Sequence, residues 1–200
     1  MLKRIILILM AGFIIIEFTN SKAWAIVRGT PTVYRVTVRK IEISKDGGVT
    51  WVTLGSGDMT FNIASVNAGA VVGNYISNTN VEAGTYNKMR ATVSRTFTVR
   101  GNILQDAGAN AGNRLYTNPN GATLVAANEG EQSVTCPTTD LPSGISLSPS
   151  GDFYCTQDIN LTFSASSPNT VTINFNVANV LELYPDDSFF PQPPGVTVTN

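Results

Sequence analysis

The amino-acid sequence predicts an all-β protein, and three observations favour an antiparallel β-sandwich. Several segments of the 200-residue chain alternate apolar and polar residues, which is the period of a strand with one buried face. Charged residues make up only 14% of the chain, against about 25% in most soluble domains, and 17 glycines and 10 prolines interrupt it. No long window has a convincing helical period. Strands without intervening helices favour a sandwich over a barrel, and the length suits one ordinary domain.

The first 25 residues have the order of an export signal. Lys3 and Arg4 precede an apolar run over 5–16, which is shorter than the roughly 20 residues that cross a bilayer. Ala23 and Ala25 then stand where a signal peptidase reads small residues before its cut. We expect residues 1–25 to be a signal peptide cleaved after Ala25, and the mature chain to be secreted, periplasmic or held at the cell surface.

A second processing route fits part of the same region. Gly12-Phe13 and Glu17 match the processing site of type IV pilins. In pilins the hydrophobic helix follows that glutamate, whereas here the apolar run precedes it. No cysteine ends the signal, which argues against a lipid anchor.

The first strands are predicted to form a hairpin over 33–54. Apolar residues alternate from Val33 to Ile43, but their parity changes between Val38 and Ile41, which indicates a bulge near Arg39. Turn residues occupy 45–48, and 49–54 is the returning strand. Shorter strand candidates cover 59–63 and 70–76.

The clearest alternation runs over 86–99 and predicts a strand with one buried face. The apolar face carries Met89, Ala91, Val93, Phe97 and Val99, and the other face is polar. Segments 159–163 and 171–177 alternate in the same way, and 179–184 is predicted to be a short helical turn. We assign the sandwich domain to residues 26–183.

An insertion of about 101–157, rich in Gly, Asn, Ser and Pro, separates these strands, with weak strand candidates at 115–116 and 122–127. It contains the chain's two cysteines, Cys136 and Cys155, which we expect to form one disulfide in an exported protein. Closing such a loop contributes roughly 3 kcal/mol through the unfolded state. The fold class is therefore an antiparallel sandwich with a disulfide-stapled loop insertion, and we expect the cysteines to be structural.

The Pro-rich C-terminal tail, residues 184–200, is predicted to be a surface strap. Phe189 and Phe190 would cover the edge of the sandwich. Otherwise the final segment 195–199 would be a free strand able to add to a neighbour's edge. Asp186 and Asp187 could contact a cation, but no third ligand lies near them in the sequence.

Composition excludes several classes of chemistry. The chain has no histidine, so Ser-His-Asp triads and imidazole metal sites are impossible. Residues 26–114 carry ten basic and five acidic side chains, a net +5, whereas 115–200 carry eight acids and no base, a net −8. Either strands of the two halves interleave and neutralise each other, or the subunit is electrically two-ended and associates head to tail. No basic nucleic-acid footprint is present, and we predict no metal, cofactor or catalytic residue.

The turn after the first strand carries a short motif. Ser44, Asp46, Gly48 and Trp51 fit the S-x-D-x-G-x-x-W pattern, which resembles the Asp-box of sialidase-like propellers. A propeller needs repeated blades of about 40 residues, and here the box occurs once. We therefore expect a structural turn in which Asp46 accepts backbone N–H bonds and Trp51 packs under the hairpin.

A second set of motifs resembles a secreted bacterial domain family of unknown function with a transthyretin-like (prealbumin-like) sandwich. Gly84, Tyr86 and Arg90 match its "L-x-A-G-x-Y-x-x-I-R" segment, whereas Asn174 and Asn176 stand where that family has acids. The resemblance implies a transthyretin/immunoglobulin-like sandwich of about seven strands without known activity. Independently, Gly84 and Tyr86 are expected to be structural at the entry of a strand.

We therefore expect a secreted, non-enzymatic binding or adhesion module whose partner is a glycan or a protein at the cell surface. The first alternative is a structural subunit that self-associates by strand addition. The second is a carboxylate-based glycosidase, which needs two acids about 5–10 Å apart across a cleft. The sequence offers no such pair, because its acids lie mostly beside turn residues.

Overall fold

A computed structural model describes residues 26–65, 81–164 and 171–199. The expected signal peptide and the strand candidate at 70–76 lie outside these ranges. Regular structure in the described residues consists of strands and one short 3-10 helix, η1 (Ala126–Asn128). None of their helices has the length and apolar character needed to cross a membrane.

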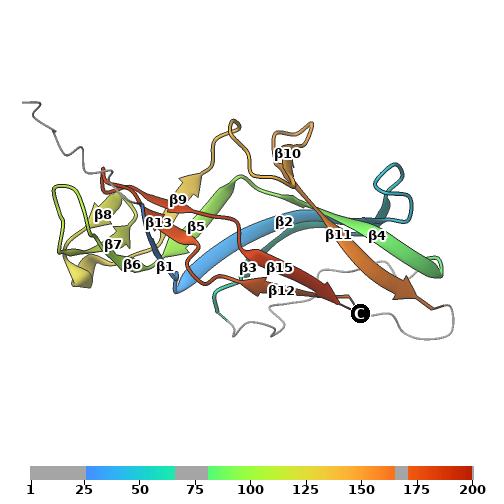
Figure 1. The fold of residues 1–200 in the computed structure, drawn as a ribbon, viewed down its shortest axis with the longest axis horizontal. Helices are drawn as coiled ribbons and strands as arrows, with labels where there is room; N and C mark the ends of the chain where they lie inside the picture. Colours follow the sequence, from blue (N-terminus) through green and yellow to red (C-terminus); the bar gives the residue numbers. More distant parts are fainter. Residues whose placement is uncertain (1–25, 66–80, 165–170, 200) are drawn as a thin grey trace, which may run out of the picture.

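The largest sheet is antiparallel and strongly curled into a half-barrel, with β2, β4 and β11 running along the long axis of the molecule (Figure 1). Its order is β10-β11-β4-β2-β5-β9, and β3 pairs with β2. The all-β, antiparallel expectation is therefore confirmed. The strands are β2 (Val33–Ser44), β3 (Val52–Asn62), β4 (Gly84–Val93), β5 (Thr96–Arg100), β9 (Gln132–Thr135), β10 (Ile145–Leu147) and β11 (Phe153–Phe163).

The predicted hairpin is formed by β2 and β3, and β3 continues to Asn62, so the candidate at 59–63 is an extension of the same strand. The register shifts between Val38 and Lys40, at the predicted bulge. Because of this shift, Val38 and Ile41 both reach the core, with exposed fractions of 7% and 5%.

The alternation over 86–99 is divided between β4 and β5, and its apolar face enters the core as predicted. Tyr86 has the opposite parity and is nevertheless fully buried. The register between β4 and β11 shifts between Asp158 and Leu161, beside Tyr86. Phe97 then joins two strands, because its ring contacts Tyr34 edge-on at 5.8 Å and stacks on Phe153 at 6.4 Å.

The described part of the chain also contains three smaller antiparallel sheets. One gathers at an end of the molecule and contains β6 (Asn102–Leu104), β7 (Arg114–Asn118) and β8 (Gly121–Thr123) (Figure 1). The second has the order β1-β13-β14, with β1 (Val27–Gly29), β13 (Leu181–Leu183) and β14 (Phe189–Pro191). The third pairs β12 (Thr172–Asn176) with β15 (Gly195–Thr199).

Two local predictions are wrong. The segment 101–157 is not a loop insertion, because it contributes β9, β10 and the first half of β11 to the main sheet. The segment 179–184 contains β13 instead of a helical turn. All three residues of β13 are buried, because β1 and β14 pair with it on both sides.

The predicted disulfide is also wrong, because Cys136 and Cys155 are free. Cys155 pairs with Ala91 of β4, whereas the N–H of Cys136 donates to the carbonyl of Arg95 at 3.0 Å. Their partners, Ala91 and Arg95, are four residues apart in the segment that forms β4 and β5, which places the two cysteines on the order of 10 Å apart. Bridged cysteines need Cα atoms within about 7 Å. Residue pairing with β4 and β5 therefore holds the two thiols apart.

The C-terminal tail packs against the rest of the same molecule. β14 pairs with β13, and the Phe189 side chain is buried, with only 3% of it exposed. β15 pairs with β12 over its whole length. The tail therefore covers the core as a strap, and its last strand has a partner within the same molecule.

Candidate functional site

The turn between β2 and β3 is organised by the carboxylate of Asp46. It accepts hydrogen bonds from the backbone N–H groups of Val49 (3.1 Å) and Thr50 (2.9 Å), and from the hydroxyls of Thr50 (2.6 Å) and Ser44 (2.7 Å). These donors, with the Thr50 hydroxyl first, hold the pKa of Asp46 well below its ordinary value. Gly48 has a φ of +96°, a conformation that favours glycine, and its N–H donates to the Ser44 hydroxyl at 2.9 Å.

The fold brings this turn against the second motif. Asn87 donates to the carbonyl of Lys45 and accepts from the N–H of Gly47, both at 3.0 Å. The Lys45 ammonium lies over the Tyr86 ring, 5.0 Å from its centre. Gly84 has a φ of +137°, and a Cβ there would lie 3.3 Å from Lys45. The residues singled out at 44–51 and at 84–86 thus form one corner of the molecule.

The outer face of the sheet carries a stack that the sequence did not indicate. The guanidinium of Arg90 lies 4.2 Å from the centre of the Trp51 ring and 4.3 Å from that of Tyr154. It also donates to Glu42 at 2.8 and 3.0 Å, and Lys40 reaches the other oxygen of the same carboxylate at 2.7 Å. Glu42 is only 4% exposed, so two cations neutralise a buried anion.

Trp51 packs against the turn of the hairpin, where its ring lies next to Gly48. Its ring is half-buried on the outer face and does not enter the core. One side of the ring contacts Arg90, and a Cβ on Gly48 would lie 3.1 Å from it. The stack therefore connects the turn to β4 and β11, and the two ring faces that meet Arg90 are not open to a ligand.

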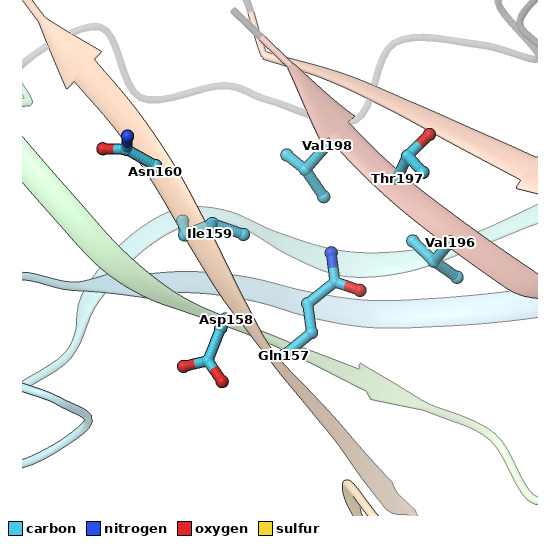
Figure 2. A pocket seen from close by; sticks show the side chains of 7 residues that line it. All are labelled: Gln157, Asp158, Ile159, Asn160, Val196, Thr197 and Val198. Atoms are coloured by element: carbon cyan, nitrogen blue, oxygen red, sulfur yellow. The ribbon is translucent and has the colours of Figure 1, made fainter.

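An open groove lies between β11 and β15, with a volume of about 440 Å³. It is lined by Gln157, Asp158, Ile159, Asn160, Val196, Thr197 and Val198. Figure 2 shows Gln157 directed across the gap toward Val196, whereas Asp158 points away from β15. Asp158 forms an ion pair with Lys88 of β4 at 2.6 Å.

Both walls of the groove are edges of paired strands. Among the described strands, β4 alone pairs with Gln157 and Asp158 of β11, and Ile159 and Asn160 lie in the register shift that follows. β12 is the only described strand that pairs with β15. The edges that face each other across the groove therefore have no strand between them in the described part of the chain. Backbone N–H and C=O groups on such edges can pair with an added strand.

The remaining predicted residues do not form a reactive centre. Burial raises the pKa of both the Cys136 and Cys155 thiols to about 11, so both are protonated at neutral pH. Among residues 26–65, 81–164 and 171–199, no group of three or more histidine, cysteine or acidic side chains could hold a metal ion.

Comparison with known proteins finds one family. A family model described as a domain of unknown function (DUF4382) matches residues 31–190, which is more than half of the chain. No curated protein and no solved structure matches the sequence of this chain.

Proposed function

Since this chain belongs to the DUF4382 family of domains of unknown function, we propose a function from its own geometry: it is an exported, non-enzymatic binding module that takes an extended peptide segment of a partner protein into the groove between β11 and β15. One observation carries the proposal. Residues 157–160 and 196–198 line opposite walls of the groove, and the described strands pair with Gln157, Asp158 and residues 196–198 on one side only. A peptide laid along one of these edges gains backbone hydrogen bonds from that edge.

The lining of the groove suits an extended peptide. Ile159, Val196 and Val198 offer apolar contacts, whereas Gln157 and Asn160 supply amide donors and acceptors. A strand places alternate side chains on opposite faces, so a bound peptide with alternating apolar and polar residues would match these walls. The lining contains no aromatic residue on which a sugar ring could stack, which favours a peptide over a glycan.

Two other functions have less support. A subunit that polymerises through its last strand needs that strand free, and β15 is paired with β12 in its own chain. A carboxylate-based glycosidase needs two acids across a cleft, and Asp158 is the one acid in the lining of the groove.

The proposed relationship to transthyretin-like sandwiches rests on Gly84, Tyr86 and Arg90, which stand at the motif positions. Tyr86 supports it, because its ring lies in the core against Phe163 at 5.2 Å and its hydroxyl donates to the backbone carbonyl of Glu82 at 3.1 Å. Export rests on the order of residues 1–25.

The test is selection of displayed random peptides on residues 26–200. Gln157→Trp places a ring in the groove and should abolish capture of the selected peptides. The control is Asn120→Trp, which adds the same ring to the exposed turn between β7 and β8. We expect selected peptides to alternate apolar and polar residues and to bind the wild type and Asn120→Trp equally.

Two results would contradict the proposal. One is equal binding of the selected peptides to Gln157→Trp and the wild type, with both proteins folded by circular dichroism. The other is failure to select any peptide while the same protein binds members of a glycan array.

A further inference from the structure

The strand β11 carries a short motif for covalent modification. Asn160 is followed by Leu161 and Thr162, which is the Asn-x-Thr order at which oligosaccharyltransferases attach N-linked glycans to exported proteins. No other asparagine in the 200-residue sequence has serine or threonine two positions later. Bacterial enzymes of this class also require an acidic residue two positions before the asparagine, and Asp158 stands there. The sequence therefore contains one complete acceptor motif, over residues 158–162.

The fold presents the three side chains of this motif to solvent. Asp158, Asn160 and Thr162 are exposed, and 85% of the Asp158 side chain is accessible, whereas Leu161 is buried. The alternation of a strand accounts for this arrangement, because residues two apart lie on the same face. Figure 2 shows Asp158 and Asn160 directed away from β15. A group attached to Asn160 would therefore extend into solvent beside the groove and leave the core undisturbed.

The backbone around Asn160 is held by fewer partners than the rest of β11. The register between β4 and β11 shifts between Asp158 and Leu161, so Ile159 and Asn160 have no partner residue on β4. On the other side of β11, pairing with β10 covers only residues 153–155. Such an irregularity disrupts the ladder locally, which leaves the segment accessible to the backbone-binding site of an enzyme.

Two contacts involve the side chains of the motif, and neither buries it. Asp158 forms its ion pair with Lys88 at 2.6 Å, and the hydroxyl of Thr162 lies 3.1 Å from that of Thr85. Both contacts lie on the exposed face of the sheet, where ion pairs are weak because water competes for the same groups. An enzyme can therefore bind these side chains in place of their neighbours.

We propose that Asn160 is the acceptor of an N-linked glycan, which an oligosaccharyltransferase transfers from a lipid pyrophosphate-linked oligosaccharide. The amide nitrogen of Asn160 forms a bond to the anomeric carbon of the first sugar, and the bond from that carbon to the pyrophosphate oxygen breaks. The lipid pyrophosphate leaves with the electron pair, and the nitrogen loses one proton to a base of the enzyme. Asp158 and Thr162 serve as recognition groups. This site shares with the proposed function only the export of the chain.

The test is expression of the full chain in a bacterium that supplies a bacterial oligosaccharyltransferase and its lipid-linked oligosaccharide. A second version carries residues 26–200 behind the host's own signal peptide, so its export does not depend on residues 1–25. We expect intact mass spectrometry to show the addition of one glycan to both versions, located by peptide mapping on Asn160. Retention of residues 1–25 in the first version would contradict the export of this chain, and the second version would still decide the site.

Variants separate the motif from a general effect of exposed asparagines. Asn160→Gln, Thr162→Val and Asp158→Asn should each abolish the added mass, whereas Thr162→Ser keeps the hydroxyl and should retain it. The matched control is Asn120→Gln, which changes an exposed asparagine followed two positions later by Ala122 and should leave the added mass unchanged. Each variant should keep the Tm of the unmodified wild type, because these side chains are exposed. An exported second version without glycan, or a glycan that persists in Asn160→Gln, would overturn the site.

Discussion

Single side chains in this protein accept hydrogen bonds from backbone N–H groups that have no partner in the strand ladders. The turn after β2 has N–H groups without ladder partners, and Asp46 accepts two of them. Its charge strengthens these bonds, because a carboxylate accepts more strongly than a neutral group. The turn therefore depends on the ionisation of one exposed residue.

The first prediction concerns this ionisation. The pKa of Asp46 is lower in the folded state than its ordinary value of 3.8, so its contribution to stability is present in full above that value. It is lost as the pH falls through the folded-state pKa. We expect Asp46→Asn to be less stable than the wild type at about pH 6, and the difference to narrow below about pH 4. Urea unfolding at both pH values measures it, and a constant difference would contradict the role of the charge.

Trp51 illustrates a second effect at this scale. Its ring lies on the outer face against Arg90, so it contributes through a cation–π contact and not through core packing. Such contacts are worth about 0.5–2 kcal/mol, which is less than the cost of removing a core tryptophan.

At the scale of elements, one buried carboxylate connects three strands and the tail. Glu182 of β13 is 2% exposed and accepts from Arg28 of β1, from the hydroxyl of Tyr184 and from the amide of Gln192. The backbone of Gln192 in turn accepts from the hydroxyl of Tyr34 in β2 at 2.9 Å. Burial raises the pKa of Tyr34, so this hydroxyl keeps its proton as the donor. The tail is therefore held by hydrogen bonds as well as by Phe189.

The second prediction tests this network with Glu182→Gln. This change keeps the side-chain volume, but it replaces one accepting oxygen by an NH2 group that faces the donors already present. We expect a loss of about 1–3 kcal/mol in the free energy of unfolding, because buried donors lose their partner. The control is Glu131→Gln, whose ion pair with Arg35 is about 40% exposed on each side and should change stability by less than about 1 kcal/mol. Equal losses in the two variants, measured by urea unfolding, would show that Glu182 does not anchor the tail.

At the scale of the whole molecule, the two oppositely charged halves of the sequence interleave. Among the residues that the structure describes, five ion pairs join a base from 26–114 to an acid from 115–200, which confirms local neutralisation. They are Arg28–Glu182, Arg35–Glu131, Arg39–Asp152, Lys88–Asp158 and Arg100–Glu129. The main sheet produces this mixing, because β11 and β9 of the second half pair with β4 and β5 of the first.

The third prediction follows from this mixing. An electrically two-ended subunit would associate more at low salt, because screening is then weak. A chain whose charges are paired internally should stay monomeric from about 0.01 M to 1 M salt, with its unfolding free energy changing by only about 1 kcal/mol. Size-exclusion chromatography with light scattering measures the mass. A rise in mass at low salt would support head-to-tail association instead.

The features predicted correctly depend on neighbours in the sequence. The hairpin of β2 and β3, its bulge between Val38 and Lys40 and the buried face of β4 and β5 follow from apolar alternation and turn residues. The buried β13 was missed, because its flanking strands come from distant segments and the pattern of Leu181 to Leu183 is too short to show a period. The predicted disulfide is absent for a similar reason, because pairing with the distant segments β4 and β5 determines how far apart Cys136 and Cys155 lie.

By itself the sequence determined that the chain is all-β, that it lacks histidine chemistry and that a carboxylate organises the turn at Asp46, because composition and local hydrogen bonding suffice for these. Only the tertiary structure decided the stack at Arg90 and the groove. Arg90 reaches Glu42 across 48 residues. The groove needs β11 and β15 side by side, and no local pattern states which strand edges will face each other. The curl and register of the sheet determine these contacts, because they set which distant residues share a face.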